Sequence, residues 1–226
     1  MSNRPDQAHQ GEGAAPEEAH LFYSLDRFNA FSDGVFAIAI TLLVLDLPVP
    51  PENAPTLPVL LKAWSEFLGY LISFAFIGSI WLTHSALTRA MKRGDAVVYS
   101  TNLLVLLFTT VLPFSTSVMV THLDTPDVGV AVLLYGLNLL LASLTLSFLM
   151  FYVARQSELL VDEIDDENLR RLYRRRWTAI AMNVFALATA LVAPRVAVGL
   201  YLITTVLLVG LPLVQLRRRW RRSRAA

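Results

Sequence analysis

The sequence predicts an all-α membrane protein with six transmembrane helices, and three observations lead to this prediction. Hydrophobic residues make up 55% of the 226 residues, charged residues only 16%, and the mean hydropathy is +0.52. The apolar residues come in blocks of about 20, the length that crosses a bilayer as a helix. If these blocks form six helices, all but two of the 19 Lys and Arg residues lie on the same side of the membrane. Without any Cys, thiolate metal sites and cysteine catalysis are excluded.

Six apolar blocks define the predicted helices. The polar residues before them have no apolar core, so residues 1–22 are predicted to be a disordered cytoplasmic tail. The blocks themselves define a six-helix transmembrane domain over 23–216, which a basic cytoplasmic tail follows over 217–226. The predicted spans are 27–47, 67–87, 96–120, 128–153, 177–193 and 196–216.

The segments between the blocks predict loops. Asp166 and Arg170 stand at helical i,i+4 spacing within the charged segment 154–176, so the fifth helix is expected to begin in the cytosol. Pro113 predicts a kink or a broken turn in the third span. An extended, non-helical connector is expected after the first span because it contains Pro48, Pro50, Pro51, Pro55 and Pro58.

The distribution of cations predicts that both termini are cytoplasmic. With that orientation only Lys62 and Arg195 lie outside. The basic runs 174–176 and 217–224 adjoin the ends of spans. We therefore expect them to fix the topology and to contact anionic lipid headgroups, with no binding of nucleic acid.

The first span carries the most informative pattern. At about 100° per residue, six of its residues fall on one stripe within about an 80° arc. The stripe is apolar except for one threonine, one glycine and an arginine at its inner end, and it consists of Arg27, Phe31, Gly34, Ile38, Thr41 and Leu45.

Asp33 points away from this stripe and lies about two turns inside the membrane, where a carboxylate needs a partner or water. Its plausible partners are His84 and Asn102, with the indole N–H of Trp81 as another donor. Two interpretations stay open for this group. It is either a polar clamp between helices or a gating or proton-sensing element.

These residues resemble the transmembrane protein 175 family, the lysosomal potassium channel and its prokaryotic relatives. The pattern Arg27-x-x-x-Phe31-Ser32-Asp33 at the start of the first span is similar to the family's signature. Trp81-x-x-His84 in the second span and Asn102-Leu103 and Leu112-Pro113 in the third resemble the family as well. A single six-span unit is similar to the prokaryotic form.

The resemblance implies a homotetramer in the cell membrane whose four first helices line a central pore for potassium. It places the hydrophobic constriction at Ile38, extended by Leu42 and Leu45, and a pore threonine at Thr41. Arg27, Phe31, Ser32, Asp33, Trp81, His84 and Asn102 would then form a network that supports or gates the pore. The family lacks a Thr-Val-Gly-Tyr-Gly filter, and this sequence has none.

The function expected from these features is passive, modestly potassium-selective conduction of monovalent cations, without a cofactor or a bound metal. One alternative is a secondary transporter or proton-coupled carrier with a site around Asp33 and His84. A structural scaffold is another. An enzyme is not expected, because the sequence contains neither His-Glu-x-x-His nor Gly-x-Ser-x-Gly.

Overall fold

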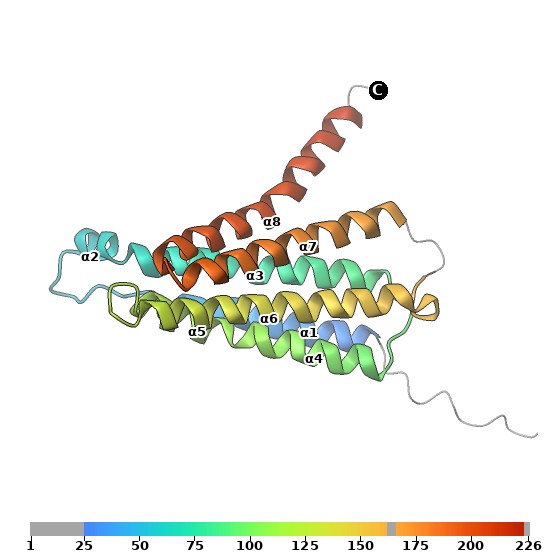
Figure 1. Ribbon diagram of the computed structural model, residues 1–226, viewed down its shortest axis with the longest axis horizontal. Coiled ribbons are helices and arrows are strands. Elements are labelled where there is room, and N and C mark those ends of the chain that lie inside the picture. Colours follow the sequence, from blue (N-terminus) through green and yellow to red (C-terminus); the bar gives the residue numbers. More distant parts are fainter. Residues whose placement is uncertain (1–24, 162–165, 224–226) are drawn as a thin grey trace, which may run out of the picture.

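A computed structural model describes residues 25–161 and 166–223, and it is helical in almost all of these residues. Long helices run side by side to form one bundle, and the last of them leaves the bundle toward the C-terminus (Figure 1). The predicted tail over 1–22 and the last residues of the basic tail lie outside the described residues. The helices are α1 (Leu25–Leu42), α2 (Thr56–Lys62), α3 (Trp64–Arg89), α4 (Ala96–Thr110), α5 (Leu112–Thr121), α6 (Val128–Arg155), α7 (Asp166–Ala190) and α8 (Pro194–Ser223).

Four segments of the described chain are long and apolar enough to cross a membrane. They are α1 with the 3-10 turn Leu43–Asp46 that follows it, α3, the α4–α5 pair and α6. A shorter apolar helix covers Pro194–Leu208. The chain is therefore a membrane protein, and the count of six spans stays a prediction for α7 and α8. Within the described residues α7 runs from Asp166, so the later part of the charged segment is helical, as the spacing of its charges predicts.

The connector after the first span differs from its prediction. Instead of remaining extended throughout, it forms the short helix α2, which contains Pro58. Pro58 is the third residue of this helix, in the first turn, where a backbone N–H would have no partner within the helix. The five prolines were therefore a reliable sign of a break after Leu47 but not of extended chain up to α3.

The third span is broken, as Pro113 predicts. α4 ends at Thr110 and α5 begins at Leu112, with Val111 between them. Proline has no N–H, and its ring displaces the carbonyl one turn earlier, so a straight helix cannot continue through this position.

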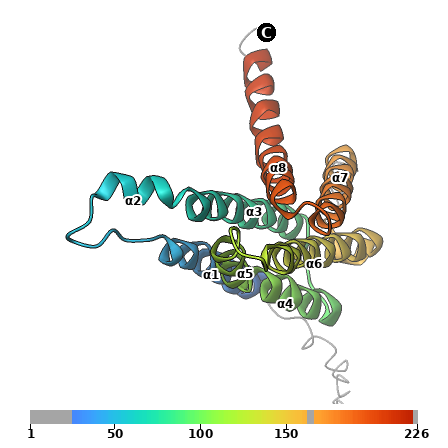
Figure 2. The ribbon, with the colours of Figure 1, turned by 60° about the vertical axis from the view of Figure 1, so that its left-hand side comes forward.

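The helices pack in an order that gives α3 and α6 central places. α3 contacts α1, α5 and α8, whereas α6 contacts α4, α5, α7 and α8. Figure 2 shows α1 and α7 on different sides of this arrangement. At one end of the bundle, the loop after α3 pairs with the loop after α6, where Lys92 N donates to Leu159 O at 2.8 Å and Val161 N donates to Ala90 O at 3.0 Å. The distribution of cations predicts that both of these loops lie on the cytoplasmic side of the membrane, and the two loops are in contact.

Glycine allows the close approach of α6 and α8. A methyl group at Gly136 would overlap the hydroxyl oxygen of Tyr201 and lie 2.6 Å from its Cζ atom. Tyr201 is fully buried and packs edge-on against Tyr135, with ring centroids 5.6 Å apart. Small residues at such contacts are what allow membrane helices to pack tightly.

We predict that Gly136→Ala lowers stability by about 1–3 kcal/mol, because the added methyl group forces Tyr201 out of its packed position. Thermal unfolding of the detergent-solubilised protein measures this. Gly129→Ala is the matched control on the same helix, because a methyl group there would meet no atom within 4 Å. Equal melting temperatures for the two variants would contradict the predicted contact.

Candidate functional site

One face of α1 is buried against the rest of the bundle. Its buried residues are spaced by four, four and three positions along α1, which keeps them on one side of a helix. The 3-10 turn adds one more buried leucine in line with them. The set consists of Phe28, Ser32, Phe36, Ala39 and Leu43.

The opposite face of α1 is the stripe that the sequence predicts, and it is exposed in the protomer. The side chains of Ile38 and Leu45 are 59% and 74% exposed, and Phe31 and Leu42 are exposed as well. A helix face that lines a pore between subunits must be exposed in the single subunit, and this face meets that requirement. The other exposed positions of the stripe are Arg27, Gly34 and Thr41.

Thr41 is the residue of this face that carries a hydroxyl group, and a hydrogen bond within the helix orients it. Its Oγ1 donates to the carbonyl oxygen of Ile38, one turn earlier, at 2.9 Å. Because the hydroxyl hydrogen is used within the helix, the oxygen lone pairs are left to accept from water or to coordinate a cation. Thr41 therefore offers an uncharged acceptor beside an otherwise apolar surface.

A chain of buried hydrogen bonds holds the other face of α1. The amide nitrogen of Asn102, on α4, donates to Ser32 Oγ at 2.9 Å. The amide oxygen of Asn102 lies 2.8 Å from Nε2 of His84, on α3. Since an amide oxygen only accepts, His84 carries a proton on Nε2 and donates it. All three side chains are buried, so the chain joins α1, α3 and α4 where water does not reach them.

Aromatic side chains enclose the imidazole of this network. Phe28 stacks on the ring of His84 with centroids 5.7 Å apart, and Phe36 approaches it at 5.5 Å. Tyr99, on α4, packs edge-on against Phe28 at 5.0 Å. Both phenylalanines belong to α1, so the hydrophobic packing and the hydrogen bonds fix the same rotation of this helix.

Asp33 belongs to a second, separate contact, which corrects part of the sequence prediction. Its Oδ1 accepts a hydrogen bond from Nε1 of Trp81 at 2.8 Å, and both residues are exposed at the protomer surface. His84 and Asn102, the expected partners of Asp33, bind each other and Ser32 instead. Consecutive helix residues point about 100° apart, so Ser32 faces α4 while Asp33 faces the indole of Trp81.

Several buried polar residues of the bundle were not singled out from the sequence, and Asn138 and Arg176 are two of them. Asn138, on α6, lies at the break in the third span, next to Ser115. Arg176, on α7, was expected at the lipid headgroups with its neighbours in the basic run. It is instead 2% exposed, and its Nη2 donates to the carbonyl oxygen of Ser143 at 2.9 Å. A search that included amides as well as ionisable groups within apolar blocks would have found Asn138.

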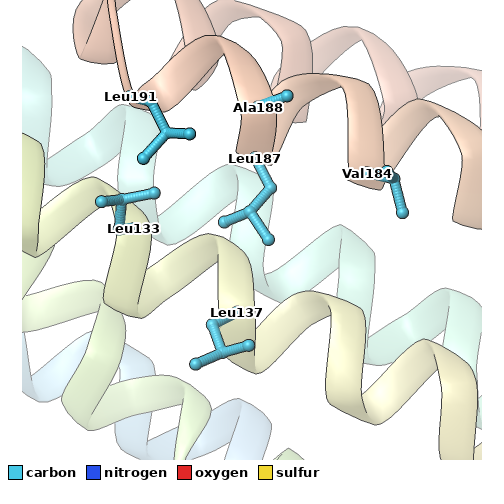
Figure 3. A pocket seen from close by; sticks show the side chains of 6 residues that line it. All are labelled: Leu133, Leu137, Val184, Leu187, Ala188 and Leu191. Carbon is cyan, nitrogen blue, oxygen red and sulfur yellow. The ribbon is translucent and has the colours of Figure 1, made fainter.

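An apolar groove lies between α6 and α7, away from the stripe. It has a volume of about 380 Å³, and Figure 3 shows the six side chains that line it. All are aliphatic, so they offer no group that binds an ion: Leu133, Leu137, Val184, Leu187, Ala188 and Leu191. Among the described residues no group of His, Asp and Glu could hold a metal ion either.

We predict that Asn102→Leu lowers stability by about 1–3 kcal/mol, because Ser32 and His84 would then keep unpaired polar atoms in a buried place. Thermal unfolding of the purified protein measures the loss. Thr110→Val is the control on the same helix, because its exposed hydroxyl bonds only to the carbonyl oxygen of Leu107. A loss no larger than that of the control would contradict the role assigned to Asn102.

Comparison with known proteins places the chain in a family. The sequence profile described as "Endosomal/lysosomal potassium channel TMEM175" matches residues 27–113, which contain the stripe, the buried network and the break. The chain is 31% identical over 189 residues to a potassium channel of Chamaesiphon minutus, covering 82% of this chain and 91% of that one. It is 33% identical over 125 residues to the endosomal/lysosomal proton channel TMEM175 of Rattus norvegicus, covering 51% of this chain and 25% of that one.

The fold agrees with this sequence similarity. The crystal structure of a lysosomal potassium-selective channel TMEM175 homolog from Chamaesiphon minutus superposes with a TM-score of 0.71 at 27% identity. The superposition covers 81% of this chain and 95% of that one. These relatives are channels and not enzymes. The chain belongs to the TMEM175 channel family.

Proposed function

We propose that four copies of this chain form a potassium-conducting cation channel, with the exposed face of α1 lining a central pore. One observation supports this most: α1 keeps a continuous apolar face with a single hydroxyl uncovered, while buried hydrogen bonds hold its other face. The printed names of the relatives also support cation conduction. We further propose that both termini are cytoplasmic, that α7 and α8 complete six spans, and that the protein resides in the cell membrane.

The proposed gate is a ring of four Ile38 side chains. An apolar ring that is too narrow for a hydrated ion excludes water and blocks current, and it conducts only when it widens. Leu42 and Leu45 lie on the same exposed side and would lengthen the apolar seal toward the outer end. Because no charged side chain lies among these three, the proposed gate works by wetting and not by charge.

The proposed selectivity comes from Thr41. Four hydroxyl oxygens around the axis would replace part of a cation's hydration shell without the strong attraction of a carboxylate. The bond from Thr41 to the Ile38 carbonyl uses the hydrogen of each hydroxyl, so that its oxygen is left as an acceptor. Neutral oxygens in one layer discriminate weakly, so we expect modest preference for potassium over sodium.

Proton conduction is a second candidate, because the rat relative, which aligns with 51% of this chain, is named a proton channel. A change of reversal potential with the pH gradient, at fixed potassium, would support it. A carrier centred on Asp33 and His84 is less consistent with the geometry, since these residues belong to two separate hydrogen-bonded groups. Uptake against a concentration gradient would favour the carrier.

We predict that Ile38→Asn increases the resting current and reduces ion selectivity. Four amide side chains around the axis keep the constriction hydrated, whereas four isoleucine side chains exclude water from it. Recordings from purified protein in planar bilayers measure both quantities. Ile203→Asn is the matched control, because Ile203 is also exposed but lies on α8. The control should leave the current and the selectivity unchanged. If Ile38→Asn also leaves both unchanged, the stripe does not line the pore.

We predict that Thr41→Val brings the permeability ratio of potassium to sodium closer to one, because valine keeps the shape of threonine and removes its oxygen. Thr41→Ser retains the oxygen and should retain the ratio. Reversal potentials under two-ion conditions measure this. A valine variant with unchanged selectivity would assign the discrimination to other groups.

A further inference from the structure

The break in the third span contains two backbone groups that a neighbouring helix binds. In an unbroken helix the N–H of Leu112 would donate to the carbonyl oxygen of Phe108. At the break the side-chain amide of Asn138, on α6, stands between these groups. In the orientation that satisfies both of its ends, its nitrogen donates to Phe108 O at 3.1 Å and its oxygen accepts from Leu112 N at 3.3 Å. The amide therefore takes the place of one missing backbone hydrogen bond.

The surroundings of Asn138 make the two backbone groups depend on its amide as their partner. Asn138 is buried, and it also lies 3.1 Å from Oγ of Ser115, in the first turn of α5. Within a bilayer a freed backbone group has no water to bind, so a neighbouring side chain must satisfy it. Pro113 removes the possibility that the helix itself closes the gap, because its ring and its missing N–H both oppose a regular turn.

The two halves of the broken span contact different parts of α1. α4 holds the inner part, through Asn102 to Ser32 and through Tyr99 to Phe28. α5 packs against α1 and against the 3-10 turn at its outer end. Ile38 lies in α1 between Ser32 and that turn. A change of angle at the break would therefore move the outer end of α1 relative to the inner end, with the proposed gate between them.

We propose that Asn138 is a positioning residue for the gate, which fixes the geometry of the break that Pro113 causes and so sets where α5 places the outer end of α1. This inference rests on the proposed channel function. Asn138 does not face the stripe and does not touch the permeant ion. It acts through the backbone of α4 and α5, because removing its amide leaves the Phe108 carbonyl and the Leu112 N–H without partners, and nothing then holds the angle between the two helices.

The test is single-channel recording of the full-length protein in planar bilayers, together with thermal unfolding. Asn138→Leu is expected to shift the open probability on the order of tenfold, the effect of losing one or two buried hydrogen bonds. Asn183→Leu is the matched control, because Asn183 is a buried asparagine on α7 that bonds to Ser143 and has no contact with the break. It should lower the melting temperature without changing the open probability.

A second variant separates positioning from simple support of the fold. Pro113→Ala restores a backbone N–H and removes the ring, so the span can close its own hydrogen bonds and Asn138 becomes dispensable. Adding Asn138→Leu to Pro113→Ala should therefore cause no further shift in open probability. If Asn138→Leu alone fails to assemble, the double variant should restore the tetramer.

Three results would overturn the inference: a wild-type open probability in assembled Asn138→Leu, additive effects of the two substitutions, or a misassembled variant that Pro113→Ala does not rescue. The failure of the channel function itself would look different, because the unmodified protein would then carry no potassium current. In that case the coupling between positions 113 and 138 in melting temperature still tests the bridge at the break.

Discussion

The rotation of the first helix about its own axis depends on one buried hydrogen-bonded chain, from Ser32 through Asn102 to His84. In a membrane the hydrophobic effect does not distinguish one apolar helix face from another, because lipid is as apolar as leucine. Polar atoms that require partners do distinguish them. A turn of about 100° would separate Ser32 from Asn102 and leave the Ser32 hydroxyl and the Asn102 amide nitrogen without the partner that each has in the bundle. The exposure of Ile38 and Thr41 follows from the rotation that satisfies this chain.

The same principle operates a second time at the break in the third span. Asn102 and Asn138 are both buried amides that bind on two sides, one joining three helices and the other bridging an interrupted backbone. The first fixes the inner part of α1 directly, and the second fixes the outer part through α5. A helix that is held at two places by different neighbours can change its shape between them, and Ile38 lies in that interval. This arrangement suits an element that must widen without leaving the bundle.

Much of this could be predicted from the sequence because periodicity and proline act locally. The exposed stripe on α1 follows from residue spacing, the break follows from Pro113, and the donor for Asp33 was among the candidates. The separation of Ser32 and Asp33 into two contacts could not be predicted, since it depends on which neighbouring helix lies on each side. The burial of Arg176 was missed for a similar reason: proximity to the end of a span does not show whether a side chain turns to the headgroups or to the adjacent helix.

The lining of the pore by α1 is tested most directly with a thiol, because the protein contains no Cys and one introduced thiol is therefore unique. Ile38→Cys is reconstituted and treated with a charged, water-soluble thiol reagent during recording, alongside Ile203→Cys on α8. We expect the reagent to block the current through Ile38→Cys irreversibly and to leave Ile203→Cys conducting. A reagent that modifies Ile38→Cys without changing its current would show that this face of α1 does not line the path of the ion.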